Sequence, residues 1–437
     1  MSHNHHGHAH VGSGSAQHTP MSRRARAAEA RMRVKVMWLL VAVLVPVVAA
    51  VVLGAVVLWP SSDSGSVSLA GVTGDAPGTQ YLTARTLSVK PFDCQGVGSG
   101  PQTSVQCAHL AVRLTSGPEE GQRVTVDIDP TVRKSGIGPG DPVRLARFRA
   151  VAGQPATYFF TDYQRNTPLA ILAVAFAVVV IAVARLRGLA ALVGLGVAFA
   201  VMIKFMIPAL LSGEDPLAVA LVSSAAIMMV LLYLAHGVSI RTTTALLGTL
   251  FGLGLSAVLG TWAVGATHLT GVGSEDDLTL TAVAGQVRLS GLLLAGIVIA
   301  SLGILNDVTV TQASAVWELR ELDPTASPRR LFAGAMRIGR DHIASSVYTL
   351  VFAYAGAALP VLLLINLADR PLNTILTGEA LSQEIVRTMV GSIGLVLSVP
   401  LTTAVGVALV RFARTAPTPP LKHDRPSTQA TVASDQG

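Results

Sequence analysis

Polar and ionisable side chains interrupt several long apolar stretches of the sequence, and these are the residues that could carry chemistry. The stretch LLLAGIVIASLGILNDVTVTQASAVWELRELDP, residues 292–324, begins as an apolar segment and then reaches Asn306 and Asp307. An ionisable residue inside a membrane helix costs about 2.5–3.5 kcal/mol on insertion scales, so such residues are retained chiefly for function. We expect the apolar helix to break at this acidic position.

Two interpretations of the break stay open. In the first, Asp307 is the N-cap of a following cytoplasmic helix, since its carboxylate accepts from the next N–H groups, and Arg337 or Arg340 neutralises it. In the second, the helix is broken and its side chains supply oxygen ligands to a cavity, as irregular backbone does in transporters. That ligand set is Asn306, Asp307, Thr309, Thr311 and Gln312.

A second polar group opens the next apolar stretch, RIGRDHIASSVYTLVFAYAG, residues 337–356, with Arg340, Asp341 and His342. If both stretches have these ends in the cytoplasm, the two groups lie at the same depth and can share a vestibule. The chain between them, residues 308–340, has apolar residues at helical spacing and is predicted to form an amphipathic segment at the membrane interface.

Two further ionisable residues lie within apolar runs. Lys204, in VMIKFMIP, either extends towards the outer interface or lines a transport path. His236, in LAHG, either stabilises the C-terminus of a helix that Gly237 caps, or relays protons.

The elements that position these residues are predicted to be membrane helices. The 437-residue chain is 51% hydrophobic and only 13% charged, against about 25% charged in soluble domains. About 20 apolar residues in a helix cross a bilayer, because the backbone must satisfy its own hydrogen bonds there. The sequence predicts eight such runs: 36–58, 168–184, 188–211, 216–235, 243–267, 288–306, 342–365 and 384–410.

Lysine and arginine residues predict the orientation of these helices, since they gather in cytoplasmic loops. With a cytoplasmic N-terminus, those loops receive Arg185, Arg187, Arg241 and the five arginines of residues 320–340, whereas the opposite loops carry almost none. We therefore expect a multi-pass protein of a bacterial plasma membrane with both termini in the cytoplasm. The same topology explains the net charge of +7, so no nucleic-acid partner is expected.

Residues 60–167, between the anchor at 36–59 and the bundle at 168–411, are predicted to form an external β-rich domain. Five alternating segments start at Tyr81, Ala108, Arg123, Pro142 and Thr157, which predicts a small barrel or sandwich, OB-like in type. The two cysteines, Cys94 and Cys107, both lie here. An oxidising compartment favours a disulfide, and a metal site with His109 is the alternative.

Residues 1–35 are predicted to be a disordered, histidine-rich and basic head, and residues 412–437 a disordered cytoplasmic tail. The head holds His3, His5, His6, His8 and His10, and neutral imidazoles of this kind bind Zn²⁺, Ni²⁺ or Cu²⁺. The alternative is a tail that binds metal only incidentally. No other cofactor is expected.

The segment GTLFG, from Gly248 to Gly252, has the small-xxx-small spacing that lets two membrane helices approach closely. We expect this face to pack against another helix, and it is also the face through which a homo-oligomer would form.

Several long segments resemble the YibE/F family of bacterial membrane proteins: NDVTVTQASAVWELRELDP, RIGRDHIASSVYTLVFAYAGAALP and EIVRTMVGSIGLVLSVPLTT. The β-rich region is similar through VRLTSGPEEGQ and DYQRNTPLAIL, so the resemblance runs from about residue 80 to residue 412. It implies the topology and carries no catalytic residue. Where that family has an acidic pair before Val308, this chain has Asn306 and Asp307.

The function expected from these features is transport. The sequence has no G-x-x-x-x-G-K-[ST] loop and no H-E-x-x-H pattern, so neither ATP-driven pumping nor an enzyme is expected. We expect a transporter or permease for an ion or small molecule, surrounded by membrane lipid. The alternative is a non-transporting scaffold or envelope sensor whose external β-domain binds a ligand or partner.

Overall fold

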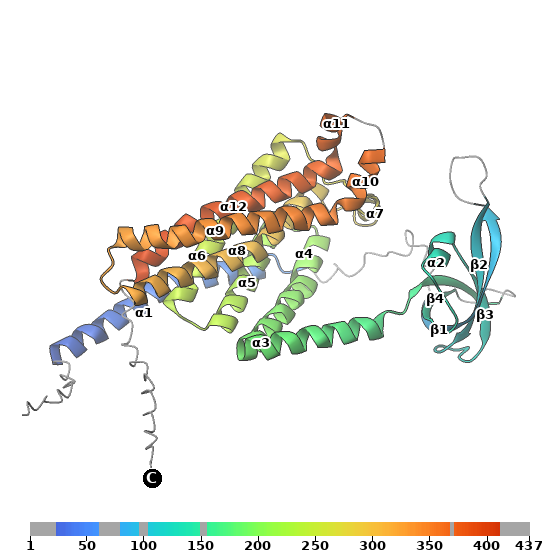
Figure 1. The fold of residues 1–437 in the computed structure, drawn as a ribbon, viewed down its shortest axis with the longest axis horizontal. Helices are drawn as coiled ribbons and strands as arrows, with labels where there is room; N and C mark the ends of the chain where they lie inside the picture. Colours follow the sequence, from blue (N-terminus) through green and yellow to red (C-terminus); the bar gives the residue numbers. More distant parts are fainter. Residues whose placement is uncertain (1–22, 61–78, 96–103, 149–154, 368–370, 411–437) are drawn as a thin grey trace, which may run out of the picture.

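The structure is a computed structural model that describes residues 23–60, 79–95, 104–148, 155–367 and 371–410. The described chain is mostly helical and carries one five-stranded antiparallel sheet (Figure 1). The sheet lies beyond the end of the helical part at which α7, α10 and α11 lie, whereas the start of α1 and the α8–α9 turn lie at the opposite end. The predicted combination of a helical bundle with a small β-rich domain is therefore found.

The five strands are the five that alternation predicts. They are β1 (Gln80–Gln95), β2 (Ser104–Leu114), β3 (Arg123–Ile128), β4 (Pro142–Phe148) and β5 (Thr157–Tyr163), with the short helix α2 (Pro130–Lys134) between β3 and β4. The strand order is β3-β2-β1-β4-β5, and the edge strands β3 and β5 approach each other. The sheet thus curls into a half-barrel around Leu110, Val112, Val143 and Leu145, which are fully buried.

The disulfide predicted from the sequence is present and joins Cys94 of β1 to Cys107 of β2, with 13 residues of sequence separation. Next to it, the rings of Phe92 and His109 stack at 4.1 Å between centroids, and His109 Nδ1 lies 2.6 Å from Asp127 Oδ1. The thiols are therefore used in a covalent link, and the alternative reading of Cys94, Cys107 and His109 as metal ligands is wrong.

The remaining elements are helical. They are α1 (Arg23–Val57), α3 (Asn166–Val201), the π-helical turn η3 (Met202–Met206), α4 (Ile207–Leu211), α5 (Pro216–His236), α6 (Ile240–Ala266), α7 (Glu275–Val283), α8 (Leu289–Leu322), α9 (Pro328–Ala357), α10 (Leu359–Leu367), α11 (Leu372–Leu376) and α12 (Glu379–Val410).

Five helical stretches of the described chain are long and apolar enough to cross a membrane, against eight predicted. They are Asn166–Leu211, Pro216–His236, Ile240–Ala266, Leu289–Leu322 and Glu379–Val410. The predicted runs 168–184 and 188–211 form one stretch, which turns sharply at Arg185 (φ 54°, ψ −132°). The run 342–365 is divided between α9 and α10, and the run 36–58 contributes the shorter apolar helix Val41–Val57.

Helix α8 does not break at Asn306 and Asp307, so both interpretations that rest on a break are wrong. The helix continues without interruption from Leu289 to Leu322, and Asp307 lies in its interior rather than at an N-cap. Asn and Asp cost a helix less than about 0.7 kcal/mol each relative to Ala, and packing of the flanking turns overrides so small a penalty. The predicted amphipathic segment 308–340 is the end of α8 joined to the start of α9.

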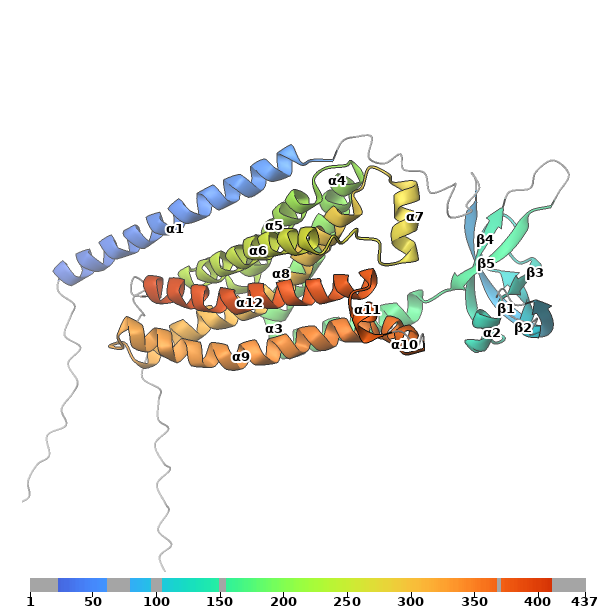
Figure 2. The same cartoon turned by 90° about the horizontal axis from the view of Figure 1, so that it is seen from above.

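Helix α8 lies at the centre of the bundle and contacts α5, α6, α9 and α12. The main core contains Met228 of α5, Leu246 and Leu253 of α6, Leu305 of α8 and Leu395 of α12, all fully buried. Figure 2 shows α12 and α9 running alongside α6 and α8, with α1 at the margin. Three polar residues of α8, Ser301, Thr309 and Gln312, are therefore buried against the neighbouring helices.

The β-domain joins the bundle through a short connection. Strand β5 ends at Tyr163 and α3 begins at Asn166. The Gln164 N–H donates to the Pro142 carbonyl oxygen (2.9 Å). The Arg165 guanidinium lies 5.6 Å from the centre of the Tyr163 ring and donates to Asp162 Oδ2 (2.7 Å). Both linking residues are thus held by contacts with the sheet.

Candidate functional site

Asp307 of α8 and His342 of α9 meet across the two helices, as predicted from their positions at one depth. His342 Nε2 lies 3.4 Å from Asp307 Oδ2, and the side chains are 30% and 69% exposed, respectively. Asp307 precedes the C-cap of α8, Asp323, by 16 residues, and His342 follows the N-cap of α9, Ser327, by 15. Because the helices are antiparallel and joined by a short turn, residues equally distant from the turn face each other.

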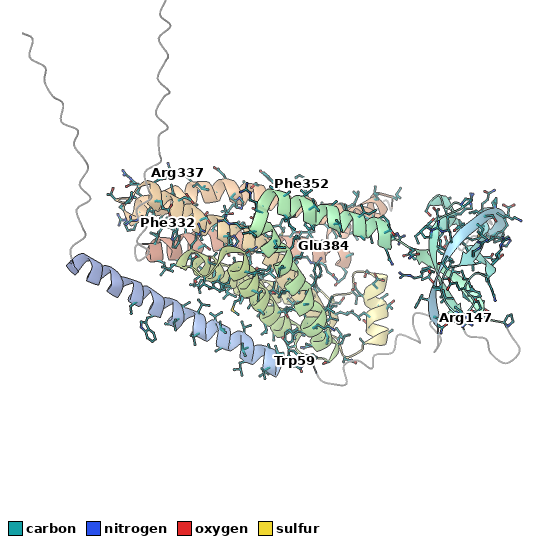
Figure 3. The ribbon with its side chains drawn as sticks, turned by 90° about the horizontal axis from the view of Figure 1, so that it is seen from below. Trp59, Arg147, Phe332, Arg337, Phe352 and Glu384 are labelled. Carbon is teal, nitrogen blue, oxygen red and sulfur yellow. A yellow bond between two sulfur atoms is a disulfide. The ribbon has the colours of Figure 1, made fainter. Side chains whose placement is uncertain are left out.

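The contact differs from the predicted one in its partner. Asp307 was expected to pair with Arg337 or Arg340, but both arginines are exposed and neither forms an ion pair with Asp307 in the structure. Figure 3 shows Arg337 at the end of the bundle away from the β-domain. Since arginine keeps its charge at all physiological pH values and histidine does not, an Asp–His pair can change its charge when a proton is gained or lost.

Two buried polar atoms, one in this pair and one next to it, have no hydrogen-bond partner within the described residues. They are Asn306 Oδ1 and His342 Nε2; the latter is within ion-pair distance of Asp307 but lacks hydrogen-bond geometry. An unsatisfied buried polar group costs about 1–3 kcal/mol. A ligand that forms hydrogen bonds with these two atoms would recover that cost, so a ligand would be stabilised at this place.

Gln312, one turn further along α8, belongs to a separate cluster. Its Nε2 donates to the Ala335 carbonyl oxygen of α9 (3.0 Å) and to Thr403 Oγ1 of α12 (2.6 Å). Its side chain is 2% exposed. Gln312 therefore ties three helices together and is already satisfied, which is a structural role rather than that of a free ligand.

The other predicted path residues lie apart from the pair. Arg340 and Asp341 are exposed on α9, Thr311 is half-buried, and no hydrogen bond or ion pair in the described part of the chain joins them to Asp307 or His342. Lys204 is exposed in the π-helical turn, as a snorkelling side chain would be. His236 ends α5, directly before Gly237 at φ 72°.

A seam of small and hydroxyl residues joins α6 to α8 and α12. Thr249 Oγ1 and Thr309 Oγ1 share a hydrogen bond of 2.7 Å between α6 and α8. A Cβ atom added at Gly248 would lie 2.0 Å from Thr402 Oγ1, and one at Gly252 would lie 2.5 Å from Leu305 Cδ2. The Gly248/Gly252 face therefore packs closely, as predicted. It packs against helices of the same chain, however, so it is buried and not open to a second copy of the chain.

An ion pair on α12 was missed by the sequence analysis. Arg387 Nη1 donates to Glu384 Oε1 (2.7 Å), and the side chains are 24% and 27% exposed, respectively. The guanidinium carbon lies 6.0 Å from the centre of the Tyr354 ring of α9. In Figure 3, Glu384 lies between the Arg337 end of the bundle and the β-domain. Opposite charges three residues apart at the start of an apolar run were the signal that could have identified the pair.

The β-domain carries a further charged cluster. The Arg147 side chain donates to Glu119 and thereby holds the pKa of that carboxyl below its ordinary value, and Tyr158 Oη also donates to Glu119 (3.0 Å). The histidines proposed to bind metal, His3, His5, His6, His8 and His10, lie outside the described residues. Among the residues the structure describes, no group of three or more His, Cys, Asp or Glu side chains could hold a metal ion.

The comparisons with known proteins show which family the helical part of the chain belongs to. The family model described as "YibE/F-like protein" matches residues 172–412, which is more than half of the chain and includes the Asp307–His342 pair, the seam and the Glu384–Arg387 pair. The match begins after the β-domain, so the similarity expected there from about residue 80 lies outside the matched range. Neither the curated proteins nor the solved structures give a match. The family and the long apolar helices together indicate a membrane protein, and the chain belongs to the YibE/F-like family.

Proposed function

We propose that the chain is a multi-pass membrane transporter, not driven by ATP, in which the Asp307–His342 pair carries the coupled ion. The observation that supports this is the 3.4 Å contact between the two side chains on neighbouring long helices, next to the buried Asn306 Oδ1, which has no hydrogen-bond partner within the described residues. Histidine is the side chain whose charge changes most readily near neutral pH. A proton is therefore the simplest coupled ion at this site.

The pair offers a way to link ion binding to helix movement. An ion held between Asp307 and His342 would contact α8 and α9 at once, and its release would remove that link between the two helices. The same two helices are also joined by Gln312, by the packing of Val316 against Leu331 and Ala335, and by a short turn. A ligand shifts a two-state equilibrium only by its differential affinity for the two states, and this pair supplies such a difference.

The proposed topology places both termini in the cytoplasm and the β-domain, an OB-like half-barrel, outside a bacterial plasma membrane. Three features support it. The arginine-rich loops predict the cytoplasmic side, and the start of α1 lies at the same end of the bundle as the α8–α9 turn, away from the β-domain. The disulfide between Cys94 and Cys107 fits an oxidising compartment.

The test begins with a substrate. Metal and metabolite profiles of a deletion strain, repeated with residues 1–20 removed, name candidates, and proteoliposomes holding a pH-sensitive dye then measure substrate and proton flux. Asp307→Asn should abolish both fluxes, because the carboxylate charge is lost, while membrane abundance stays normal. Glu318→Gln is the matched control, since Glu318 is an exposed acidic residue three turns further along α8. Undiminished flux in Asp307→Asn would show that the pair is not on the path.

The close packing of the α6–α8–α12 seam favours the alternative function, a membrane scaffold or envelope sensor whose β-domain binds a ligand or partner. A helix interface in which added methyl groups would overlap neighbours, as at Gly248 and Gly252, resists the separation that a path along it requires. A partner recovered in stoichiometric amount, together with a deletion strain whose uptake and efflux are unchanged, would establish this function instead of transport.

A further inference from the structure

The sharp turn of α3 lies beside the end of α5 and the start of α6, and basic side chains of all three helices meet there. Arg187 follows the turn at Arg185, His236 is the last residue of α5, and Arg241 lies in the first turn of α6. Arg187 and Arg241 are close enough to His236 for both of their charges to act on it. Arg187, His236 and Arg241 are called the basic cluster below.

Within the described residues, no acidic side chain neutralises the basic cluster. Neither Arg187 nor Arg241 is a member of the ion pairs or side-chain hydrogen bonds found there. Arg241 is nevertheless half-buried, and a charge that is partly withdrawn from water without a counter-ion is destabilised. The preference of arginine for cytoplasmic loops explains why such charges are present, but it does not require them to converge from three helices. The cluster therefore favours an anion beside it.

The two arms of α3 diverge from the turn beside this cluster (Figure 1, Figure 3). The first arm begins at Asn166, directly after the β-domain, and reaches the turn at Arg185. At about 1.5 Å per residue it rises about 28 Å, which is close to the thickness of about 30 Å of a bilayer core. If this arm crosses the bilayer, the basic cluster lies at the surface opposite the β-domain.

Both arms carry apolar side chains that are exposed in the structure. Val174 of the first arm is 62% exposed, and Val193 and Phe199 of the second arm are 51% and 52% exposed. The arms touch near the turn, where a Cβ atom at Gly188 would lie 2.5 Å from the Val180 carbonyl oxygen. In a membrane, exposed apolar helix surfaces contact lipid chains. Chains that lie against these arms therefore end near the basic cluster.

The charged cluster and the apolar arms together select the occupant. A soluble anion such as free phosphate compensates the charges but does not cover the arms. Phosphatidylcholine covers the arms, but its choline group brings a further positive charge to a site that already has an excess. An anionic phospholipid meets both requirements, since arginine binds phosphate oxygens through two parallel N–H groups, and basic pockets between membrane helices hold such head groups.

We propose that the basic cluster binds the phosphate head group of one anionic phospholipid, whose acyl chains lie against the arms of α3. The head group accepts from Arg187 of α3 and from Arg241 of α6, so the lipid joins the turn of α3 to the bundle. This site is formed by α3, α5 and α6, whereas the Asp307–His342 pair lies on α8 and α9. It depends on α3 crossing the bilayer and not on transport.

The test uses the full chain in phosphatidylcholine nanodiscs that contain a trace of photoprobe lipid. Two probes carry the same diazirine acyl chain and differ only in the head group, which is phosphatidylglycerol or phosphatidylcholine. Labelled α3 peptides are mapped by mass spectrometry, and the ratio of phosphatidylglycerol to phosphatidylcholine labelling is measured. Arg187→Gln/Arg241→Gln removes two charges of the cluster. Arg329→Gln/Arg337→Gln is the matched control, because it removes two exposed positive charges of α9.

The ratio should be about 25 in the wild type and in the α9 control, and about one in Arg187→Gln/Arg241→Gln. This is about fivefold, or about 1 kcal/mol, for each arginine that faces an anionic head group. Arg187→Lys/Arg241→Lys should keep most of the ratio, because the charges remain. Equal labelling by both probes in the wild type, or an equal loss in the α9 control, would overturn the site. Displacement of the phosphatidylglycerol probe by inorganic phosphate at constant ionic strength would identify a soluble anion as the occupant and overturn the lipid.

Discussion

The seam between α6 and α12 makes a sharp prediction for Gly248→Ala. A Cβ atom at this position would lie 2.0 Å from Thr402 Oγ1, 3.1 Å from Thr402 Cβ and 3.2 Å from Thr309 Cγ2. The Thr402 hydroxyl donates to the Ser398 carbonyl oxygen (2.7 Å), so turning it aside breaks that bond. Overpacking of a well-packed core costs about 1–3 kcal/mol, and we expect a loss of unfolding free energy in that range.

A second substitution separates the clash from other causes. Thr402→Ala removes the Oγ1 atom and should restore about half of the lost stability in the double variant, which gives a favourable coupling of about 1 kcal/mol. Thr402→Val keeps an atom in the place of Oγ1 and should restore nothing. Gly254→Ala, on the same helix with open space around it, should be neutral or stabilising by up to about 1 kcal/mol, because alanine favours helix over glycine.

The assay is equilibrium unfolding of the purified chain in mixed micelles, followed by circular dichroism as the denaturing detergent increases. If Gly248→Ala proves as stable as Gly254→Ala, the close approach of α6 and α12 is wrong. Rescue by Thr402→Val as effective as that by Thr402→Ala would refute the assignment of the clash to the Oγ1 atom.

Three further predictions follow from contacts described above. Replacing Cys94 and Cys107 by serine should destabilise the β-domain by about 3 kcal/mol on the chain-entropy model for so short a loop, measured by hydrogen exchange of β1 and β2 amides in the full chain. Arg147 lowers the pKa of Glu119 in the folded domain, so the ionised Glu119 stabilises the fold above the carboxyl pKa of the unfolded chain. This stabilisation is lost as the pH falls through the pKa of Glu119 in the folded domain. Glu119→Gln should therefore remove this part of the acid sensitivity in thermal unfolding between pH 3 and 7. Gln312→Leu should cost about 1–3 kcal/mol in detergent unfolding, since buried groups on α9 and α12 lose their donor.

Each of these has a matched comparison. Wild-type chain treated with a reductant should show the same amide exchange as the serine variant. Glu120→Gln changes an exposed neighbour of Glu119 and should leave the acid unfolding profile as in the wild type. Thr311→Val, next to Gln312 but half-buried, should change stability by less than about 0.5 kcal/mol. A Thr311 variant as unstable as the Gln312 variant would contradict the special role of Gln312.

The β-strands could be predicted because their signal is local. Apolar and polar residues alternate in each strand, and Gly-Pro turns separate them, so short windows carry the answer. The disulfide was predicted because both cysteines lie in the region expected to be external, where an oxidising compartment favours a disulfide. The curl of the sheet depends on the approach of its two edge strands, β3 and β5, which are distant in sequence. The alternation of apolar and polar residues within a strand does not predict which strands approach each other.

The break expected at Asn306 and Asp307 shows where local reasoning fails. The sequence marks a change from apolar to polar residues, which was interpreted as the end of a helix, but polarity and helix ends are different properties. The helix continues because its buried face persists through Val308, Thr309 and Gln312, while Asp307 points outward and is exposed. The meeting of Asp307 with His342 agrees with the prediction that both lie at one depth, which rests on the distribution of arginines. The antiparallel helices and their short turn, which were not predicted, determine which residues face each other.

The Glu384–Arg387 pair and its cavity needed the structure. The sequence shows two opposite charges near the start of α12, which are compatible with an interfacial position. The placement of α9, α10 and α11 beside Glu384 forms an open cavity there, and that placement is set by contacts distant in sequence.

The two-residue connection between β5 and α3 has a mechanical consequence. Since Gln164 and Arg165 are both bound to the sheet, little slack separates the half-barrel from the first arm of α3. That arm is exposed along its length until the turn at Arg185. A rotation of the half-barrel is therefore expected to turn the first arm of α3 about the bend at Arg185, because no flexible linker separates the half-barrel from this helix.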